Sequence, residues 1–192
     1  MKRKYLVGMV LGVLSVLSLA VPANASAGAG GFAAQAREAG YSPAQSAALQ
    51  HKVDRYVALM HGRQVAINKV EFPGGDVLLP LPGEKRAREL GAVTPAASYH
   101  GCAYAHMCLF PDRSYAGTKI DMVYCYEMDI PDGWRSRHGS WSNNQTAGTQ
   151  GIFYHWYPGH RWGVWGLTGN PPAAQPDADW APVASVRNCW DD

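Results

Sequence analysis

The sequence lacks the motifs of the common hydrolases. None of its seven histidines lies in an H-E-x-x-H zinc motif, and there is no G-x-S-x-G nucleophile motif. The four cysteines are better explained by disulfides than by a Cys/His catalytic pair. We expect His155 and His160 to be surface residues, and Asp177 and Asp179 to be solvated. The sequence therefore predicts a protein that is not an enzyme and needs no cofactor.

Long apolar runs are also scarce, and the one present lies at the N-terminus. Cations at positions 2–4 precede an apolar stretch over residues 5–21, which small residues follow. This order is typical of a signal peptide cleaved after Ala25 or Ala27. A membrane anchor would need at least about 17 apolar residues and a basic stop-transfer cluster, which does not follow. We expect residues 1–25 to be removed and the mature protein to be secreted, with no membrane span.

Excess positive charge is absent from the rest of the chain. Removing the three leading cations from 17 basic residues leaves 14, against 15 acidic residues. Nothing in this balance favours nucleic acid as a partner. Zinc is disfavoured as well, because its sites use paired short cysteine spacings and the only one here is Cys102-x5-Cys108.

Cysteine and tryptophan are missing from the first hundred residues. All seven tryptophans lie beyond residue 100, as do all four cysteines, Cys102, Cys108, Cys125 and Cys189. An even cysteine count in an exported chain indicates two disulfides. We therefore divide the mature chain into an accessory region with a linker, residues 26–98, and a disulfide-stapled β domain, residues 99–192.

The accessory region is predicted to be a helix followed by a β-hairpin. Ser42 is a suitable N-cap with Pro43 at the first helical position, and apolar residues recur at helical spacing as far as Met60. A hairpin is expected over residues 65–81, turning at 73–76. Residues 26–41, rich in Ala and Gly, are expected to be mobile, and a short helix is an option at 84–90.

The second region is predicted to be all-β. Short aromatic and β-branched runs occur near residues 103–110, 118–126, 150–157, 161–165 and 182–188, separated by turn residues. Phe110 and Tyr115-Ala116-Gly117 form an aromatic hairpin unit in which the glycine is free to take a positive φ. We expect Trp141, Trp156, Trp165 and Trp180 to fill the interior.

Four motifs of this region carry a resemblance to a known family. They are Cys102-x5-Cys108, the hairpin unit from Phe110 to Gly117, Trp141 with Asn143-Asn144, and the ending Trp180 … Val186-Arg187-Asn188-Cys189. The segment from Tyr99 to Trp190 resembles the secreted actinobacterial peptidase inhibitors whose founding members inhibit metalloproteinases. The resemblance implies a βγ-crystallin-like Greek-key domain stapled by two disulfides. The region ahead of it, including Leu79-Pro80-Leu81-Pro82-Gly83-Glu84, is similar to an accessory region of some members.

The short spacing between Cys102 and Cys108 favours a local loop, which would leave Cys125 to pair with Cys189. Four cysteines allow three pairings, so the other two stay open. Crystallin-like domains often bind calcium through paired Asn/Asp residues followed by a hydroxyl. Asn143-Asn144-Gln145-Thr146 begins that pattern, but Ala147 stands where the hydroxyl is expected, so no metal site is predicted.

The resemblance implies an extracellular proteinase inhibitor that acts as a monomer on a metalloproteinase. Its inhibitory loop falls near Trp165, Gly166, Leu167 and Thr168, ahead of Pro171-Pro172. In the metalloproteinase inhibitors a disulfide closes this loop, whereas the matching positions here are not cysteines. The alternative is a module that binds cell-wall or other polysaccharide through exposed aromatics such as Trp162. A crystallin-like domain with no protease target is a third hypothesis.

Overall fold

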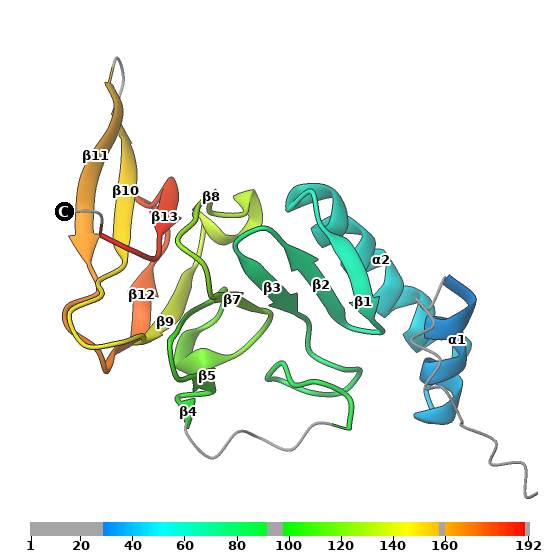
Figure 1. Ribbon diagram of the computed structural model, residues 1–192. Helices are drawn as coiled ribbons and strands as arrows, with labels where there is room; N and C mark the ends of the chain where they lie inside the picture. Colours follow the sequence, from blue (N-terminus) through cyan, green and yellow to red (C-terminus); the bar gives the residue numbers. More distant parts are fainter. Residues whose placement is uncertain (1–28, 92–97, 158–159, 191–192) are drawn as a thin grey trace, which may run out of the picture.

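The computed structural model describes residues 29–91, 98–157 and 160–190. The predicted signal peptide, residues 1–25, lies outside these ranges. Within them, no helix combines the length and the apolar character that crossing a membrane requires. Two helices lie at one end of the molecule and the β10–β11 hairpin lies at the other (Figure 1).

Helix α1 (Ala29–Glu38) forms where we expected a mobile segment. The prediction was wrong because Phe32 and Ala36 lie four residues apart and both are buried. Side chains at this spacing share one face of a helix. Ala36 joins the main core cluster, so a single small apolar face is enough to dock the helix.

Helix α2 (Pro43–Leu59) begins as predicted, at a complete capping box. The backbone N–H of Gln45 donates to Ser42 Oγ at 3.2 Å, and the N–H of Ser42 donates to Gln45 Oε1 at 2.9 Å. Two N–H groups that the helix leaves unpaired are thereby satisfied. The apolar face of the helix buries Leu49, Val53 and Tyr56 against the sheet.

Three strands follow α2 instead of the single hairpin predicted. They are β1 (Arg63–Ala66), β2 (Lys69–Phe72) and β3 (Gly75–Leu78). The alternation of apolar and polar residues over 65–70 predicted one strand, but a turn at Ile67 and Asn68 divides it. Asn68 is buried there, and its Nδ2 donates to the carbonyls of Leu79 and Arg88 at 2.6 and 2.9 Å. These bonds satisfy the side-chain nitrogen of a polar residue in the interior.

The remaining strands are short. They are β4 (Ser98–Tyr99), β5 (Cys102–Ala103), β6 (His106–Phe110), β7 (Lys119–Met122), β8 (Glu127–Asp129), β9 (His138–Asn144), β10 (Ile152–Tyr157), β11 (His160–Leu167), β12 (Ala173–Asp179) and β13 (Ser185–Arg187). Two 3-10 turns interrupt them at Arg113–Tyr115 and Asp132–Trp134. The helix considered at residues 84–90 does not form.

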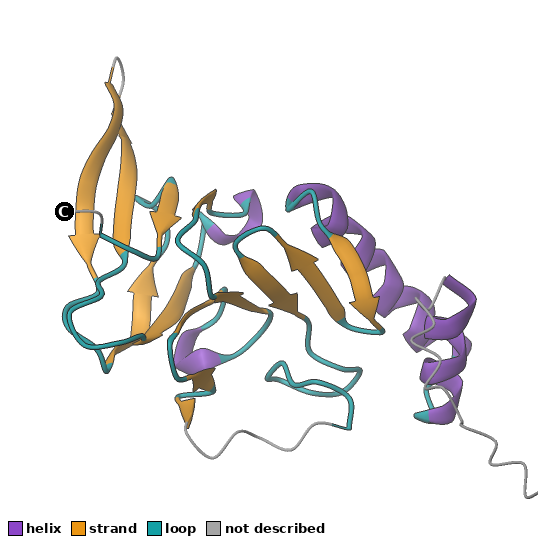
Figure 2. Cartoon of the chain, in the orientation of Figure 1, coloured by secondary structure: helices purple, strands orange, loops and turns teal. Residues whose placement is uncertain are grey.

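The strands form two principal sheets, drawn in orange in Figure 2. The larger has the order β1-β2-β3-β7-β6-β9-β12, and the smaller has the order β11-β10-β13-β8. Strand β3 pairs antiparallel with β7, which places Val77 opposite Ile120. Residues on both sides of position 98 therefore share one sheet and one hydrophobic core.

Both disulfides form as expected. Cys102 pairs with Cys108, and Cys125 pairs with Cys189. The first bridge is buried and joins β5 to β6, whereas the second joins the chain ahead of β8 to the chain beyond β13. Closing the longer loop stabilises the fold by about 4 kcal/mol on loop-entropy arguments. The prediction of a disulfide-stapled, mainly β protein is confirmed.

The aromatic hairpin unit also forms. The rings of Phe110 and Tyr115 meet edge to face at 5.8 Å, and Gly117 has φ +82°. A Cβ at Gly117 would lie 2.7 Å from Pro111 Cγ, closer than real Cβ atoms approach. Glycine is therefore required here by both backbone conformation and space.

Candidate functional site

The four candidate residues of the predicted inhibitory loop lie at the end of strand β11. Trp165, Gly166 and Leu167 belong to the strand itself and Thr168 follows it, so three of the four are not in a loop. Among the described strands, β11 pairs with β10 alone and so forms an edge of the smaller sheet. Val164, Trp165 and Leu167 are exposed, with 54%, 55% and 43% of their surface accessible.

A β-bulge explains why Trp165 is on the surface. Phe153 of β10 faces Gly166 and Tyr154 faces Val164, which leaves Trp165 as the extra residue. A bulge breaks the alternation of strand side chains and redirects the residue it contains. The expectation that Trp165 fills the interior was therefore wrong. Its ring lies 5.6 Å from that of His155 instead.

Thr168 fixes the end of the exposed segment. It is buried, and its Oγ1 accepts hydrogen bonds from Asn143 Nδ2 at 2.8 Å and from the Gly151 N–H at 2.9 Å. The backbone N–H of Thr168 donates to the Gly151 carbonyl at 3.0 Å. These three hydrogen bonds, with Asn143 and Gly151, hold Thr168 in place. They therefore restrict the motion of Leu167, which precedes it.

The same asparagine explains the segment that resembles a calcium motif. Asn143 is buried, and its side chain also bonds to the Thr149 carbonyl and to the Gln145 N–H. Asn144 Nδ2 donates to the Cys102 carbonyl at 3.0 Å. Both amides thus hold neighbouring loops in place.

A cleft of about 220 Å³ opens between edge strands β11 and β12, where the two sheets meet. Trp165, Gly166 and Leu167 form one wall, and Gln175, Asp177 and Asp179 are on the other. Trp141, Phe153 and Trp180 form its aromatic base. The cleft therefore combines an apolar base with carboxylates at the rim.

The base of the cleft is rigidly packed. Trp180 is 1% exposed, and its Nε1 donates to the Phe110 carbonyl at 2.8 Å. Phe153 contacts Trp180 and Trp141 at ring distances of 5.9 and 5.7 Å. A Cβ on Gly139 would lie 1.9 Å from Trp180 Nε1, so only glycine fits beside the indole. The expectation of an interior position is confirmed for Trp180, whereas Trp141 is half-buried.

Asp177, one of the two carboxylates on the β12 wall, has two basic neighbours. Its Oδ1 accepts from Arg113 Nε at 2.8 Å and lies 2.6 Å from His138 Nδ1. Hydrogen bonds from Arg113 and His138 lower the pKa of Asp177 below its ordinary value. This aspartate is exposed, as expected, and it also has two basic neighbours.

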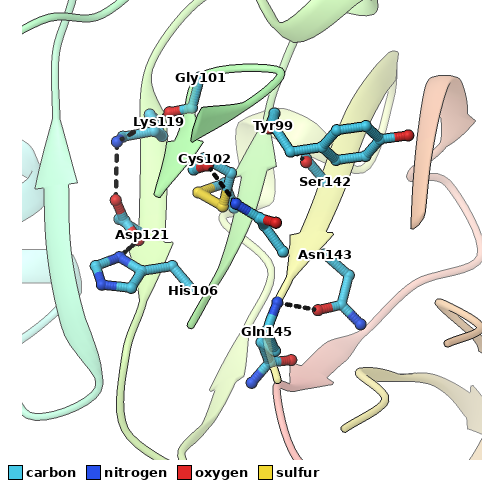
Figure 3. The surroundings of a disulfide bond; sticks show 11 residues. Tyr99, Gly101, Cys102, His106, Lys119, Asp121, Ser142, Asn143 and Gln145 are labelled. Atoms are coloured by element: carbon cyan, nitrogen blue, oxygen red, sulfur yellow. Dashed lines mark hydrogen bonds and ion pairs between the residues drawn. A yellow bond between two sulfur atoms is a disulfide. The ribbon is translucent and has the colours of Figure 1, made fainter. Parts of the chain in front are cut away.

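A second polar cluster lies beside the Cys102–Cys108 disulfide (Figure 3). Asp121 of β7 is buried, with His106 Nδ1 at 2.6 Å and Lys119 Nζ at 2.8 Å from its two oxygens. Burial alone would raise the pKa of Asp121, but the bonds from His106 and Lys119 outweigh it and hold that pKa below normal. The hydrogen bond to Asp121 raises the pKa of His106.

The cluster continues onto the neighbouring strand. Asp76 of β3 stands opposite Asp121 in the register, and Lys69 Nζ lies 3.3 Å from Asp76. Burial and the charge of Asp121 raise the pKa of Asp76. Each carboxylate has a basic partner, which offsets part of the cost of burying its charge. No local pattern in the sequence predicts this cluster, because it depends on the register of four strands, β2, β3, β7 and β6.

One group in the described ranges has metal-ligand geometry. The sulfurs of Cys102 and Cys108 and a carboxylate oxygen of Asp121 lie within 4.8 Å of one another. The two sulfurs are joined in a disulfide, and a metal requires thiolates. The side chain of Trp162, the leading residue of the glycan alternative, and that of Trp156 lie outside the described set.

Comparisons with protein-family models, with curated proteins and with solved structures find no match for this chain.

Proposed function

We propose that this chain is a secreted proteinase inhibitor with a crystallin-like Greek-key fold, and that it acts by presenting the end of β11 to an extracellular metalloproteinase. The observation that carries the proposal is the exposed edge strand. Trp165 and Leu167 project from it, Thr168 anchors its end, and its outer edge pairs with no strand within residues 29–91, 98–157 and 160–190.

An edge strand suits this role because it is already extended. Extended peptides bind partners by adding a strand to a sheet, and the exposed side chains then enter pockets. Leu167 supplies an apolar side chain of the kind that thermolysin-like enzymes favour on the leaving side. Because the segment already has its bound shape, little conformational entropy is lost on binding.

The loop disulfide of the resembling inhibitors has a substitute in this chain. The buried hydroxyl of Thr168 accepts two hydrogen bonds at the end of the strand, whereas those inhibitors close their loop covalently. On the far side of the smaller sheet, Cys125–Cys189 fastens β8 to β13. Hydrogen bonds and the second bridge together limit the motion of the presented strand.

Secretion is part of the proposal. Two disulfides, with no free cysteine in the described chain, suit an oxidising compartment. Intact-mass analysis of exported protein should find an N-terminus at Ser26 or Gly28. A retained leader would contradict the signal-peptide assignment.

Inhibition assays on a panel of metallo-, serine and cysteine proteases test the function. We expect stoichiometric inhibition of a thermolysin-like metalloproteinase at micromolar concentration. The absence of any metalloproteinase inhibition would refute the proposal.

The cleft favours polysaccharide binding as the second candidate. Its exposed Trp165 ring and the carboxylates of Asp177 and Asp179 are groups that stack on and hydrogen-bond to sugars. Pull-downs on chitin, cellulose and peptidoglycan separate the two functions. Retention on one of them, with no protease inhibited, would favour the binding module.

A further inference from the structure

A second, larger groove shares no lining residue with the β11–β12 cleft. Its volume is about 840 Å³, and four chain segments form it: α2 from Gln45 to Leu59, residues 79–85, residues 111–118 and residues 131–137. We call it the α2 groove. It includes the segment Leu79-Pro80-Leu81-Pro82-Gly83-Glu84, which has no role in the proposed inhibition.

The walls of the α2 groove are stiff and its base is apolar. Prolines line it at positions 80, 82, 111 and 131, and each fixes its own φ angle. Beneath them lie the buried side chains of Leu49, Leu79, Leu81 and Trp134. A groove with such walls needs little rearrangement to receive a ligand.

A hydrogen-bond donor lies at the base. The indole Nε1 of Trp134 donates to the Tyr56 hydroxyl oxygen at 3.3 Å, and Tyr56 is only 4% exposed. The Tyr56 O–H has no acceptor among the described residues. A buried hydroxyl hydrogen of this kind favours an oxygen-bearing ligand.

The rim of the groove is positively charged, because ion pairs within the chain neutralise its carboxylates. Each lining carboxylate has a partner: Glu84 with Arg88 at 2.6 Å, Asp112 with Arg137 at 3.1 Å, and Asp132 with Arg135 at 3.7 Å. Lys52 and Lys85 are exposed on the rim and form no ion pair with any described residue. Arg55 lies over the Tyr56 ring.

We propose that the α2 groove binds an acidic, extended polypeptide segment of a partner protein. Apolar side chains of that segment pack on the leucines and Trp134, and its carboxylates neutralise Lys52 and Lys85. A polypeptide provides both chemistries along one chain, which matches an apolar base between charged rims. The assignment gives residues 43–85 a binding function and does not depend on protease inhibition.

Binding of a short labelled peptide of alternating Glu and Leu, measured by fluorescence anisotropy, tests the proposal. A peptide of the same length with alternating Lys and Leu is the control of opposite charge. The acidic peptide should bind, and added salt should weaken it. Lys52→Glu and Lys85→Glu should each weaken binding about fivefold, because each reverses one charge at the rim. Arg37→Glu, an equal charge change on α1, should leave binding unchanged.

Chemical-shift mapping places the peptide independently. Shifts should gather on α2, residues 79–85 and Trp134, and not on β11. The proposal is overturned if the basic peptide binds equally well or if Arg37→Glu has the same effect as the rim variants. A protein dimer that the rim substitutions dissociate would assign the groove to a second copy instead, and full competition by free glutamate would assign it to a small anion.

Discussion

Replacing Thr168 by Val tests whether the exposed strand is anchored as described. Valine keeps the shape of threonine but removes the hydroxyl, so Asn143 Nδ2 and the Gly151 N–H each lose a buried acceptor at 2.8 and 2.9 Å. An unsatisfied buried donor costs about 1–3 kcal/mol. The free energy of unfolding should therefore fall by about 2–6 kcal/mol, since two donors are affected.

Thr146→Val is the matched control for this substitution. Thr146 is exposed, and its hydroxyl contacts that of Thr149 at 3.0 Å. Its loss should change the free energy of unfolding by less than about 0.5 kcal/mol. Urea denaturation measures both variants, and protease inhibition is read in parallel. Equal stability of Thr168→Val and wild type would refute the anchor, and so would a penalty in Thr146→Val as large as that of Thr168→Val.

Two further predictions concern stability. The raised pKa of His106 means that its bond to Asp121 stabilises the fold fully below the ordinary histidine pKa of 6.5, and that this contribution is lost as pH rises through the raised value. Urea denaturation should show the advantage of wild type over His106→Asn shrinking from acid to alkaline pH, and a pH-independent difference would contradict it. Gly139→Ala should destabilise by about 1–3 kcal/mol because its Cβ would collide with Trp180, whereas Gly133→Ala, with open space, should not. Thermal unfolding of both glycine variants checks this, and tolerance of Gly139→Ala would show that Trp180 can move.

Local signals in the sequence identified several features correctly. Ser42, Pro43 and Gln45 start α2 through contacts within one turn, so adjacent residues suffice to predict the cap. The unit from Phe110 to Gly117 is similarly local. The pairing of Cys102 with Cys108 followed from their short spacing and determined the other disulfide.

Features that depend on distant contacts were missed. Strand β12 has the sequence Ala-Ala-Gln-Pro-Asp-Ala-Asp, which resembles a loop, yet pairing with β9 holds it as an edge strand that tolerates Pro176. Strand β9 buries three polar residues, Ser140, Ser142 and Asn143, whose side chains hydrogen-bond to other segments of the chain. The bulge that exposes Trp165 arises from the register of β10 against β11, which composition does not encode.

The pairing of β3 with β7 could not be predicted from the sequence either. Val77 and Ile120 are both fully buried, and either could have faced another apolar strand. Nothing in a single sequence specifies which strands pair across more than forty positions. The β11–β12 cleft was therefore only half predicted: the β11 wall was named as a candidate site, whereas Asp177 and Asp179 of the β12 wall were expected only to be solvated.

The inhibition constant of Leu167→Asp tests the central claim most directly. Leu167 is 43% exposed, and Leu90, at 39% and outside β11, is its matched control. Leu167→Asp should weaken inhibition of a thermolysin-like enzyme by about 1–3 kcal/mol, the usual loss for an interface anchor. Leu90→Asp should inhibit like wild type, and both variants should keep the wild-type unfolding temperature. Equal inhibition by Leu167→Asp and wild type would contradict the assignment of β11 as the inhibitory strand.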